Sequence, residues 1–473
     1  MNSKEQIKEY FKETARERLL WQKRNRFYHH SLEKYFSFII PAGSRVLELG
    51  CGTGDLLNAV KPGYGVGIDF SEEMVISAGG LYPDLHFIYA DIEELSDQDE
   101  RIGGPFDYII LSDLLHILWD VQKALHLLMR FCHPGTRLVI SNYNFLWEPM
   151  LKFSEWIGLK QKSPNSNWLS HHDIFNLLEI EGFDIISNYR KLLLPKYIPL
   201  FNILFNKFLI NLPLVNNLGL VNFVVARPMA NWQQDFKVSV IIPARNEKGN
   251  IESAMQRMPA FGSSQEFIFV EGHSSDGTWD EMIRVKELYP QRNITVIKQT
   301  GKGKGNAVRE GFDIASGEVL IILDADLTVP PEELPKFYNA LVLSRGEFIN
   351  GCRLVYPMEK QAMRFLNLMA NKLFGWFFSY LLGQRLKDTL CGTKVIFKAD
   401  YEKIKANRSY FGDFDPFGDF DLLFGAARLN LKIVEVVVRY KERTYGSTQI
   451  SRFKHGWLLL KMSMFAAGKI KFN

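Results

Sequence analysis

Two successive series of short apolar runs, separated by one polar stretch, most constrain how this chain can fold. The last run of the first series, residues 223–226, stops at Arg227–Pro228, and the first run of the second, residues 238–242, stops at Pro243. In both series the runs alternate with helix-like segments, which is the pattern of a doubly wound α/β sheet. We therefore predict two α/β domains joined by a polar linker at residues 229–236.

Length and composition agree with two globular domains. The chain has 473 residues, of which 47% are hydrophobic and 23% are charged, and a domain takes about 100–200 residues. A net charge of +4 is too small to favour a nucleic-acid partner. The four cysteines form no CxxC pair, so neither zinc nor disulfides are expected, and a reducing cytoplasmic compartment fits best.

The N-terminal segment and two apolar stretches bear on the location of the protein. Residues 1–38 are charged and lack the apolar core of a signal peptide, so we expect a helical segment. No stretch looks like a true span of about 20 mostly apolar residues. Residues 197–214 and 363–383 either pack as helices on their own domains or lie on a membrane surface. The protein is therefore expected in the cytoplasm, with a peripheral contact at the inner face of the membrane left open.

The first half carries a glycine loop directly after the apolar run at residues 46–49. Gly50, Gly52 and Gly54 allow a tight turn and a close approach of backbone to a ligand. Alone, such a loop is also what a plain strand–helix turn needs. Two later apolar runs end at Asp69 and Asp91, and ligands of doubly wound sheets bind beyond the strand ends. Each aspartate either contacts a ligand or only caps the next helix.

The motif "VLELGCGTG" at residues 46–54 resembles the class I S-adenosylmethionine-dependent methyltransferases. The resemblance implies a Rossmann-like domain over residues 39–228 with S-adenosylmethionine as cofactor. It assigns Asp69 to the ribose hydroxyls, and Asp91 and Ile92 to the adenine. The residues that it assigns to the methionine portion of the cofactor are Glu48, Gly50, Cys51, Gly52 and Gly54.

Methyl transfer requires an acceptor atom held in line with the methyl group, and a hydroxyl acceptor also benefits from a general base. His116, after the fourth apolar run, is the only histidine placed for that role, although a histidine there can also lack a catalytic duty. The sequence "LSDLL" at residues 111–115 lacks the Asn-Pro-Pro-aromatic pattern of enzymes that methylate base or amide nitrogens. This favours an oxygen acceptor and argues against nucleic acid.

In the second half, Asp324 and Asp326 follow the apolar run at residues 319–323. Two carboxylates at positions i and i+2 of a strand face the same way, and they are hard oxygen donors for Mg²⁺ or Mn²⁺. Such a metal neutralises a diphosphate leaving group. An isolated D-x-D is also common as a helix cap, so the motif needs support from its context.

That context resembles the family 2 glycosyltransferases of the GT-A fold, over residues 237–473. The resemblance rests on "VIIPARNE" (240–247), "EGHSSDGT" (271–278) and the D-x-D, although Glu271 and Gly272 stand where the family usually has two aspartates. It implies a nucleotide-sugar donor, with Lys304 either near the phosphates or only solvated. The residues that it places at the nucleotide-sugar are Pro243, Ala244, Arg245, Glu247, Asp276 and Asp324.

Residues 386–404 and 436–456 further resemble the polyprenyl-phosphate mannosyl- and glucosyltransferases. The acceptor is then a polyprenyl phosphate, or else a hydroxyl of a glycan or metabolite. A hydroxyl needs a base, for which Asp419 or Asp421 is the candidate, whereas a phosphate needs none. Arg439 and Arg443 either clasp a phosphate or form surface salt bridges.

Together these features predict a bifunctional bacterial transferase. One domain transfers a sugar with inversion and with the help of a metal ion. The other methylates an oxygen atom of an acceptor in the same glycan, glycolipid or metabolite pathway. The alternative is a glycosyltransferase whose methyltransferase-like domain only binds S-adenosylmethionine, as a scaffold or regulatory module.

Overall fold

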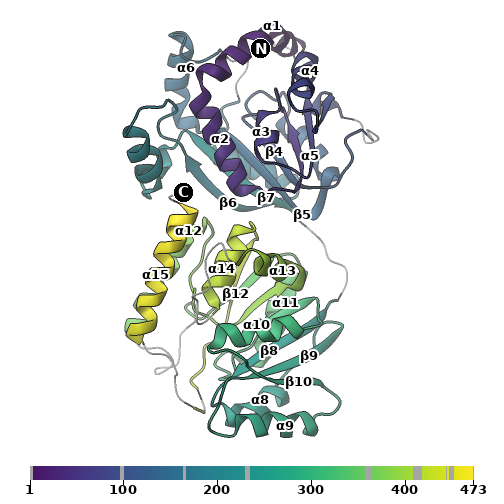
Figure 1. Cartoon of the computed structure of the whole chain (residues 1–473), viewed down its shortest axis with the longest axis vertical. Coiled ribbons are helices and arrows are strands. Elements are labelled where there is room, and N and C mark those ends of the chain that lie inside the picture. Colours follow the sequence, from purple (N-terminus) through teal and green to yellow (C-terminus); the bar gives the residue numbers. More distant parts are fainter. Residues whose placement is uncertain are drawn as a thin grey trace. The chain divides into compact units, whose positions relative to one another are not determined.

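The computed structural model divides the chain into two compact units, each built on its own seven-stranded sheet (Figure 1). Unit 1 is Met1–Met229 and unit 2 is Ala230–Asn473. The structure describes residues 4–471 except 96–100, 163–166, 230–234, 357–364, 409–417, 444 and 447–451. The boundary between the units lies inside the polar stretch at residues 229–236.

The sheet of unit 1 has the strand order β3-β2-β1-β4-β5-β7-β6. Its first five strands run parallel, and β7 is antiparallel to both β5 and β6. The order reverses between β1 and β4, which makes the carboxyl end of β1 the switch point where ligands bind in such sheets. The strands are β1 Arg45–Leu49, β2 Tyr64–Asp69, β3 His86–Tyr89, β4 Phe106–Ser112, β5 Cys132–Tyr143, β6 Phe183–Lys191 and β7 Val221–Pro228.

Helices cover both faces of this sheet because successive strand residues point to opposite sides. Val46 packs under α2, with Phe36 and Phe223, whereas Leu47 packs with α5 and α7. The helices are α1 Lys4–Arg24, α2 Arg26–Ile39, α3 Asp55–Ala59, α4 Glu72–Leu81, α5 Val121–Leu128, α6 Glu148–Trp156 and α7 His171–Ile180. The short turns are η1 Ile92–Glu94, η2 Met129–Phe131, η3 Phe145–Trp147, η4 Ile203–Phe208, η5 Leu209–Asn211 and η6 Val215–Leu218.

The sheet of unit 2 has the order β10-β9-β8-β11-β13-β12-β14. β13 runs antiparallel to both of its neighbours, and the other pairs are parallel. The D-x-D therefore lies beyond the carboxyl end of β11, beside the equivalent end of β8. The strands are β8 Lys237–Ala244, β9 Ser264–Glu271, β10 Asn293–Lys298, β11 Val319–Ile322, β12 Phe348–Cys352, β13 Lys394–Phe397 and β14 Ile433–Val437.

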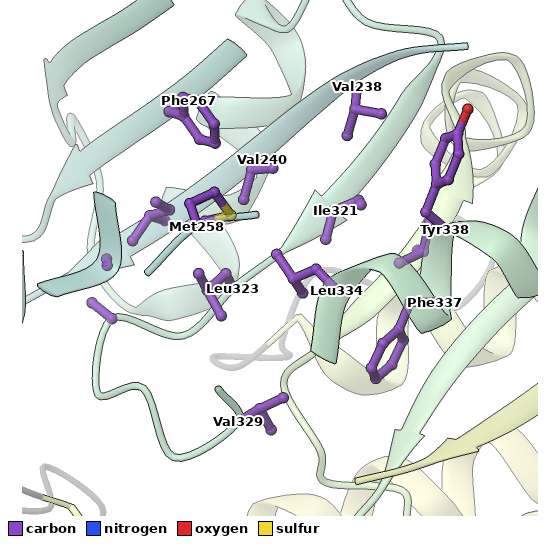
Figure 2. Close-up of a cluster of buried hydrophobic side chains, with 14 of the residues drawn as sticks. Val238, Val240, Met258, Phe267, Ile321, Leu323, Val329, Leu334, Phe337 and Tyr338 are labelled. Atoms are coloured by element: carbon purple, nitrogen blue, oxygen red, sulfur yellow. The ribbon is translucent and has the colours of Figure 1, made fainter. Parts of the chain in front are cut away.

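Unit 2 also has a core on each face of its sheet. Figure 2 shows one of them, where Val240 and Ile321 of adjacent strands face Leu334 and Phe337 of α11. Helices α10, α12, α13, α14 and α15 supply the opposite core. The helices are α8 Lys248–Gln256, α9 Thr278–Leu288, α10 Lys304–Ile314, η7 Pro331–Glu333, α11 Leu334–Val342, α12 Phe365–Leu382, α13 Lys398–Ala406, α14 Asp419–Arg428 and α15 Arg452–Ile470.

The two α/β sheets predicted from the sequence are confirmed. Within the described part of the chain, no helix has both the length and the apolar character needed to cross a bilayer. Both ambiguous apolar stretches are packed on their own unit and still expose apolar side chains. Leu200 and Leu214 are exposed in the first stretch, and Leu373 and Trp376 in the second.

Candidate active sites

The glycine loop of unit 1 turns sharply at the carboxyl end of β1. Gly50 and Gly54 have φ angles of 69° and 79°, a backbone region that side chains disfavour. A Cβ at Gly50 would also lie 2.8 Å from the Leu114 side chain. The chain can therefore reverse direction and start α3 only with glycine at these positions.

Asp69 ties this loop to the end of β2. Its two carboxylate oxygens accept hydrogen bonds from Gly52 N (2.8 Å) and from Ser71 N (2.9 Å), and the side chain is buried. These bonds keep the loop and the second strand end together. The role of Asp69 toward a ribose stays a prediction.

Glu48 is a buried acid with an unused acceptor. Among the described residues its Oε2 has no hydrogen-bond partner. Burial raises the pKa of Glu48 well above its usual value, against a backbone hydrogen bond from Leu57, and the nearby Asp69 raises it further. Buried polar atoms are nearly always paired in native proteins, so this oxygen is suited to a donor on a ligand.

Glu48 faces a cavity of about 700 Å³, large enough for a cofactor-sized ligand. Gly50, Cys51, Gly52 and His116 also line it, so the structure brings these predicted residues together. The wall further includes parts of α1 and α2 and residues 160–162. Gly54 and Asp69 are not among the residues that line it.

Asp91 and Ile92 lie at the next strand end. Asp91 Oδ1 accepts a hydrogen bond from Glu93 N (3.0 Å) and so caps η1, while its Oδ2 lies 2.9 Å from Lys4 Nζ of α1. Ile92 is buried in the core. Asp91 thus performs the capping role that the sequence left open, and its contact with adenine stays a prediction.

Asp113 is a further acid in the lining of this cavity, and sequence reasoning missed it. Tyr28 Oη donates to Asp113 Oδ2 (2.6 Å), and Ser141 Oγ donates to its Oδ1 (3.2 Å). Burial, and then the charge of Asp113, raises the pKa of Tyr28 well above its usual value. Asp113 directly follows β4, so its place at a strand end was the available signal. His116 lies close by, with its ring centroid 5.6 Å from that of Tyr143.

In unit 2, cations from two other elements meet the D-x-D. Asp324 Oδ1 lies 2.6 Å from Lys304 Nζ, at the first residue of α10. Asp326 Oδ2 lies 2.7 Å from Arg443 Nη2, and the other arm of this guanidinium lies 2.7 Å from Glu247 Oε1. The structure thus joins five residues that the sequence had placed at the donor or phosphate.

The positive charges keep Asp324 ionised. Burial raises the pKa of its carboxyl, but Lys304, Lys394 and Arg353 outweigh this effect and hold the pKa below its ordinary value. Asp326 also accepts hydrogen bonds from the backbone N (3.1 Å) and the hydroxyl (2.8 Å) of Thr328. Asp324 is therefore available as an anion at neutral pH.

Arg353, Asp388 and Gly392 are site residues that the sequence did not reveal. The guanidinium of Arg353 pairs with the buried Asp388 through Nε (2.7 Å) and Nη2 (2.8 Å), and Asn371 of α12 donates to the same carboxylate (3.0 Å). A Cβ at Gly392 would collide with Asp324 Oδ2 and Lys304 Nζ. The available signals were an arginine directly after β12 and a glycine in "CGTK".

The remaining nucleotide-sugar candidates border the ends of β8 and β9. Pro243 and Ala244 end β8, and Arg245 after them is exposed. Asp276 accepts hydrogen bonds from Thr278 N (3.0 Å) and Tyr445 Oη (3.3 Å). The contact of these residues with a nucleotide stays a prediction.

The acceptor candidates are dispersed. Asp421 is buried and pairs with Arg408 Nε (2.9 Å), so its carboxylate already has a partner within the fold. Asp419 opens α14, but its side chain lies outside the described part of the structure. Arg439 is exposed, with its guanidinium carbon 5.3 Å from the ring centroid of Tyr356. The base and phosphate roles of these residues stay predictions.

Comparison with known families assigns each unit. Residues 20–188 match the family described as "Methyltransferase domain", and residues 239–403 match "Glycosyl transferase family 2". The chain joins a methyltransferase domain to a family 2 glycosyltransferase domain. Both resemblances drawn from the sequence motifs are thereby confirmed.

Curated relatives match the glycosyltransferase domain. A dolichol-phosphate mannosyltransferase of Pyrococcus furiosus is 40% identical over 107 residues, which are 22% of this chain and 30% of the relative. An undecaprenyl-phosphate 4-deoxy-4-formamido-L-arabinose transferase of Photorhabdus laumondii is 29% identical over 153 residues, or 31% of this chain and 46% of the relative. The chain thus spans less than half the length of these relatives.

Solved structures resemble each half. A SAM-dependent methyltransferase of Thermotoga maritima aligns with 47% of this chain and 99% of its own, at 18% identity and a TM-score of 0.36. Glucosyl-3-phosphoglycerate synthase of Mycobacterium tuberculosis, solved with Mn²⁺ and UDP, aligns with 50% of this chain and 81% of its own, at 17% identity and a TM-score of 0.37.

The site of unit 2 predicts a pH dependence of nucleotide binding. Burial raises the pKa of Glu247 to about 7, against the lowering effect of Arg443 and Asn250. Below that pH the neutral carboxyl competes less for Arg443, so a nucleoside diphosphate binds more tightly. We expect the affinity to rise roughly threefold to tenfold from about pH 8 to about pH 6, measured by calorimetry.

The matched variant is Glu247→Gln, which removes the titrating group and keeps the shape. It should abolish the step near pH 7 and leave only the titration of the nucleotide itself. A step of unchanged size in this variant contradicts the assignment to Glu247.

Proposed function

We propose that unit 2 transfers a sugar from a nucleotide-sugar to a polyprenyl phosphate, and that unit 1 methylates an oxygen in the same pathway. The observation that carries the first half is the pair of carboxylates at the end of β11, each held by a cation from another element. When ligands bind, the cations of this site can pair with a diphosphate, and the carboxylates can bind a metal ion. The names of the two curated relatives support a polyprenyl-phosphate acceptor.

The donor diphosphate is the ligand that fits the cations of this site. Lys304 and Arg443 are paired directly with Asp324 and Asp326, and the charge of Arg353 also acts on Asp324. When a diphosphate enters, these cations can turn from the carboxylates to its oxygens, which stabilises the nucleotide as a leaving group. Each of these cations then keeps an anionic partner before and after the diphosphate binds.

A divalent cation fits the carboxylates that this exchange releases. Asp324 and Asp326 offer the hard oxygen atoms that Mg²⁺ and Mn²⁺ prefer. The described residues contain no cluster of three or more metal-ligating side chains, so we assign the other ligands to the substrate. When bound, the metal neutralises the charge that develops on the leaving diphosphate.

A phosphate acceptor is already ionised and attacks without a base, so Asp419 has a catalytic role only if the acceptor is a hydroxyl. The lipid chain of a polyprenyl phosphate requires contact with a membrane. Helices α12 and α15 contact each other and expose Leu373, Trp376, Trp457 and Met464. We assign this surface to peripheral membrane contact, since apolar side chains with tryptophan suit the bilayer interface.

In unit 1, Glu48 and the glycine loop fit S-adenosylmethionine. The free Oε2 of Glu48 can accept from the ammonium group of the methionine portion, and Asp69 holds the loop that contacts the rest. The cofactor, when bound, supplies an electrophilic methyl group. Asp113 and His116 line the same cavity and can take the proton of an acceptor hydroxyl.

The donor site is tested by nucleoside-diphosphate release from a panel of nucleotide-sugars with Mn²⁺. Undecaprenyl phosphate should stimulate release with one donor. Asp326→Asn should lower the rate about 100-fold or more, because it removes a charged ligand of the metal. Asp313→Asn, at an exposed salt bridge with Lys405, is the matched control and should keep full activity.

An unchanged rate of nucleoside-diphosphate release in Asp326→Asn contradicts the metal assignment. A rate of nucleoside-diphosphate release that undecaprenyl phosphate does not change contradicts the polyprenyl-phosphate acceptor. It points to a hydroxyl acceptor with Asp419 as base.

The cofactor site is tested by calorimetric titration of S-adenosylmethionine. Glu48→Gln should weaken binding about tenfold, because it removes a carboxylate partner of the ammonium group. Glu72→Gln, exposed at the start of α4, should have no effect. Equal affinities for the wild type and Glu48→Gln contradict the placement of the methionine portion at Glu48.

A further inference from the structure

Unit 1 exposes an apolar surface that neither proposed reaction uses. We name it the apolar ridge, formed by α6 with the residues up to Leu159 and by residues 197–218. Its most prominent side chains are Leu214, Leu200 and Trp156, which are 84%, 80% and 78% exposed. Large contiguous apolar surfaces are rare on soluble monomers and mark interaction sites.

The two parts of the apolar ridge are joined by hydrogen bonds. Asn144 Nδ2 donates to the carbonyl oxygens of Asn217 (3.0 Å) and Gly219 (2.9 Å). Trp147 Nε1 donates to Leu218 O (2.8 Å). Figure 1 accordingly shows α6 and the teal segment that precedes β7 on the same side of unit 1. The ridge is one surface although its parts are about 50 residues apart in the sequence.

The segment is built with its polar side chains inward and its apolar side chains outward. Asn206 Oδ1 accepts from the backbone N of Leu193 (2.7 Å) and Leu194 (2.9 Å), and Asn202 Nδ2 donates to Lys196 O (3.0 Å). Asn202 and Asn211 are buried. Surface loops in water normally show the reverse. The internal hydrogen bonds therefore keep the leucine side chains exposed to solvent, where another surface can bind them.

The charge of the ridge identifies what covers it. Between Asp184 and Asp235 the chain has no acidic residue; Lys207 is exposed within the ridge segment, and Lys196 is exposed directly before it. On α6, Glu148 pairs with Lys152 (2.6 Å), and Glu155 pairs with Lys160, the residue after the ridge. With both acids of α6 paired to lysines, Lys196 and Lys207 leave the ridge and its flanking residues with an excess of positive charge. Such an apolar surface fits an anionic lipid bilayer, because the apolar side chains insert among the lipids while the lysines contact the headgroups.

We propose that the apolar ridge docks unit 1 on an anionic membrane. Leucines that are at least 80% exposed project from the surface, which suits insertion into lipid better than a groove on a protein. The helix α6 runs between Tyr143 and Lys160, both of which line the cavity of unit 1. Docking thus brings the cavity to the lipid surface, where, if the proposed methyl transfer holds, the acceptor is lipid-linked.

Insertion is tested on the full chain with Leu200→Cys carrying an environment-sensitive fluorophore. With vesicles of phosphatidylglycerol and phosphatidylethanolamine we expect a several-fold rise in fluorescence that brominated lipids quench. Ile180→Cys, at a 57% exposed position at the end of α7, is the matched control, and its label should show the fluorescence of an aqueous environment. Cys51, Cys352 and Cys391 are buried and Cys132 is half-buried, so background labelling is measured on the unmutated chain.

A second variant tests the energetics. Leu200→Ser combined with Leu214→Ser should lower the partition of the protein into these vesicles about tenfold, because each leucine adds apolar area. The control combines Ile76→Ser with Ile180→Ser, two exposed residues outside the ridge. Binding of S-adenosylmethionine, measured on the same samples, should be unchanged, so that failure of docking and failure of the cofactor site are distinguished.

Two outcomes overturn the proposal. A label at Leu200 that stays in water while the protein is bound to vesicles shows that unit 1 does not insert. A label that is shielded without vesicles, in a dimer that the double serine variant dissociates during sedimentation, shows that the ridge is an interface between copies.

Discussion

The ion pairs of Asp324 and Asp326 organise the proposed donor site of the glycosyltransferase domain. Two adjacent carboxylates at a partly buried sheet edge repel each other and require positive partners. The partners come from the start of α10 and from beyond β14, and Arg443 is 117 positions from Asp326 in the chain. Because these contacts tie distant elements to the end of β11, ligand binding here must act on the ion pairs themselves.

The candidate sites of the two units hold their carboxylates with different partners. At the end of β2 in unit 1, the carboxylate of Asp69 is held by neutral backbone N–H groups, and one oxygen of Glu48 has no partner among the described residues. In unit 2 the carboxylates are held by full positive charges. The open carboxylate oxygen of Glu48 suits the ammonium group of S-adenosylmethionine, whereas Lys304 and Arg443 suit a diphosphate. The proposed functions of the two units thus rest on different charges at their strand ends.

The fold and the centre of each site could be predicted from the sequence, because apolar runs and the motifs that follow them are local signals. Glu48, the glycines, Asp324 and Asp326 all belong to such motifs. Long-range partners could not be predicted. Arg353 meets Asp388, Lys4 meets Asp91, and Tyr28 meets Asp113 only through tertiary packing. The apolar ridge was ambiguous because the inward direction of its asparagines is not visible in a sequence.

The most direct test of the account is a crystal structure of the full chain with a nucleoside diphosphate and Mn²⁺, with the metal located by its anomalous scattering. The account predicts a manganese ion bound by Asp324 and Asp326, with Lys304 and Arg443 turned to the diphosphate. Both ion pairs intact, with the nucleotide or the metal bound elsewhere, would contradict it.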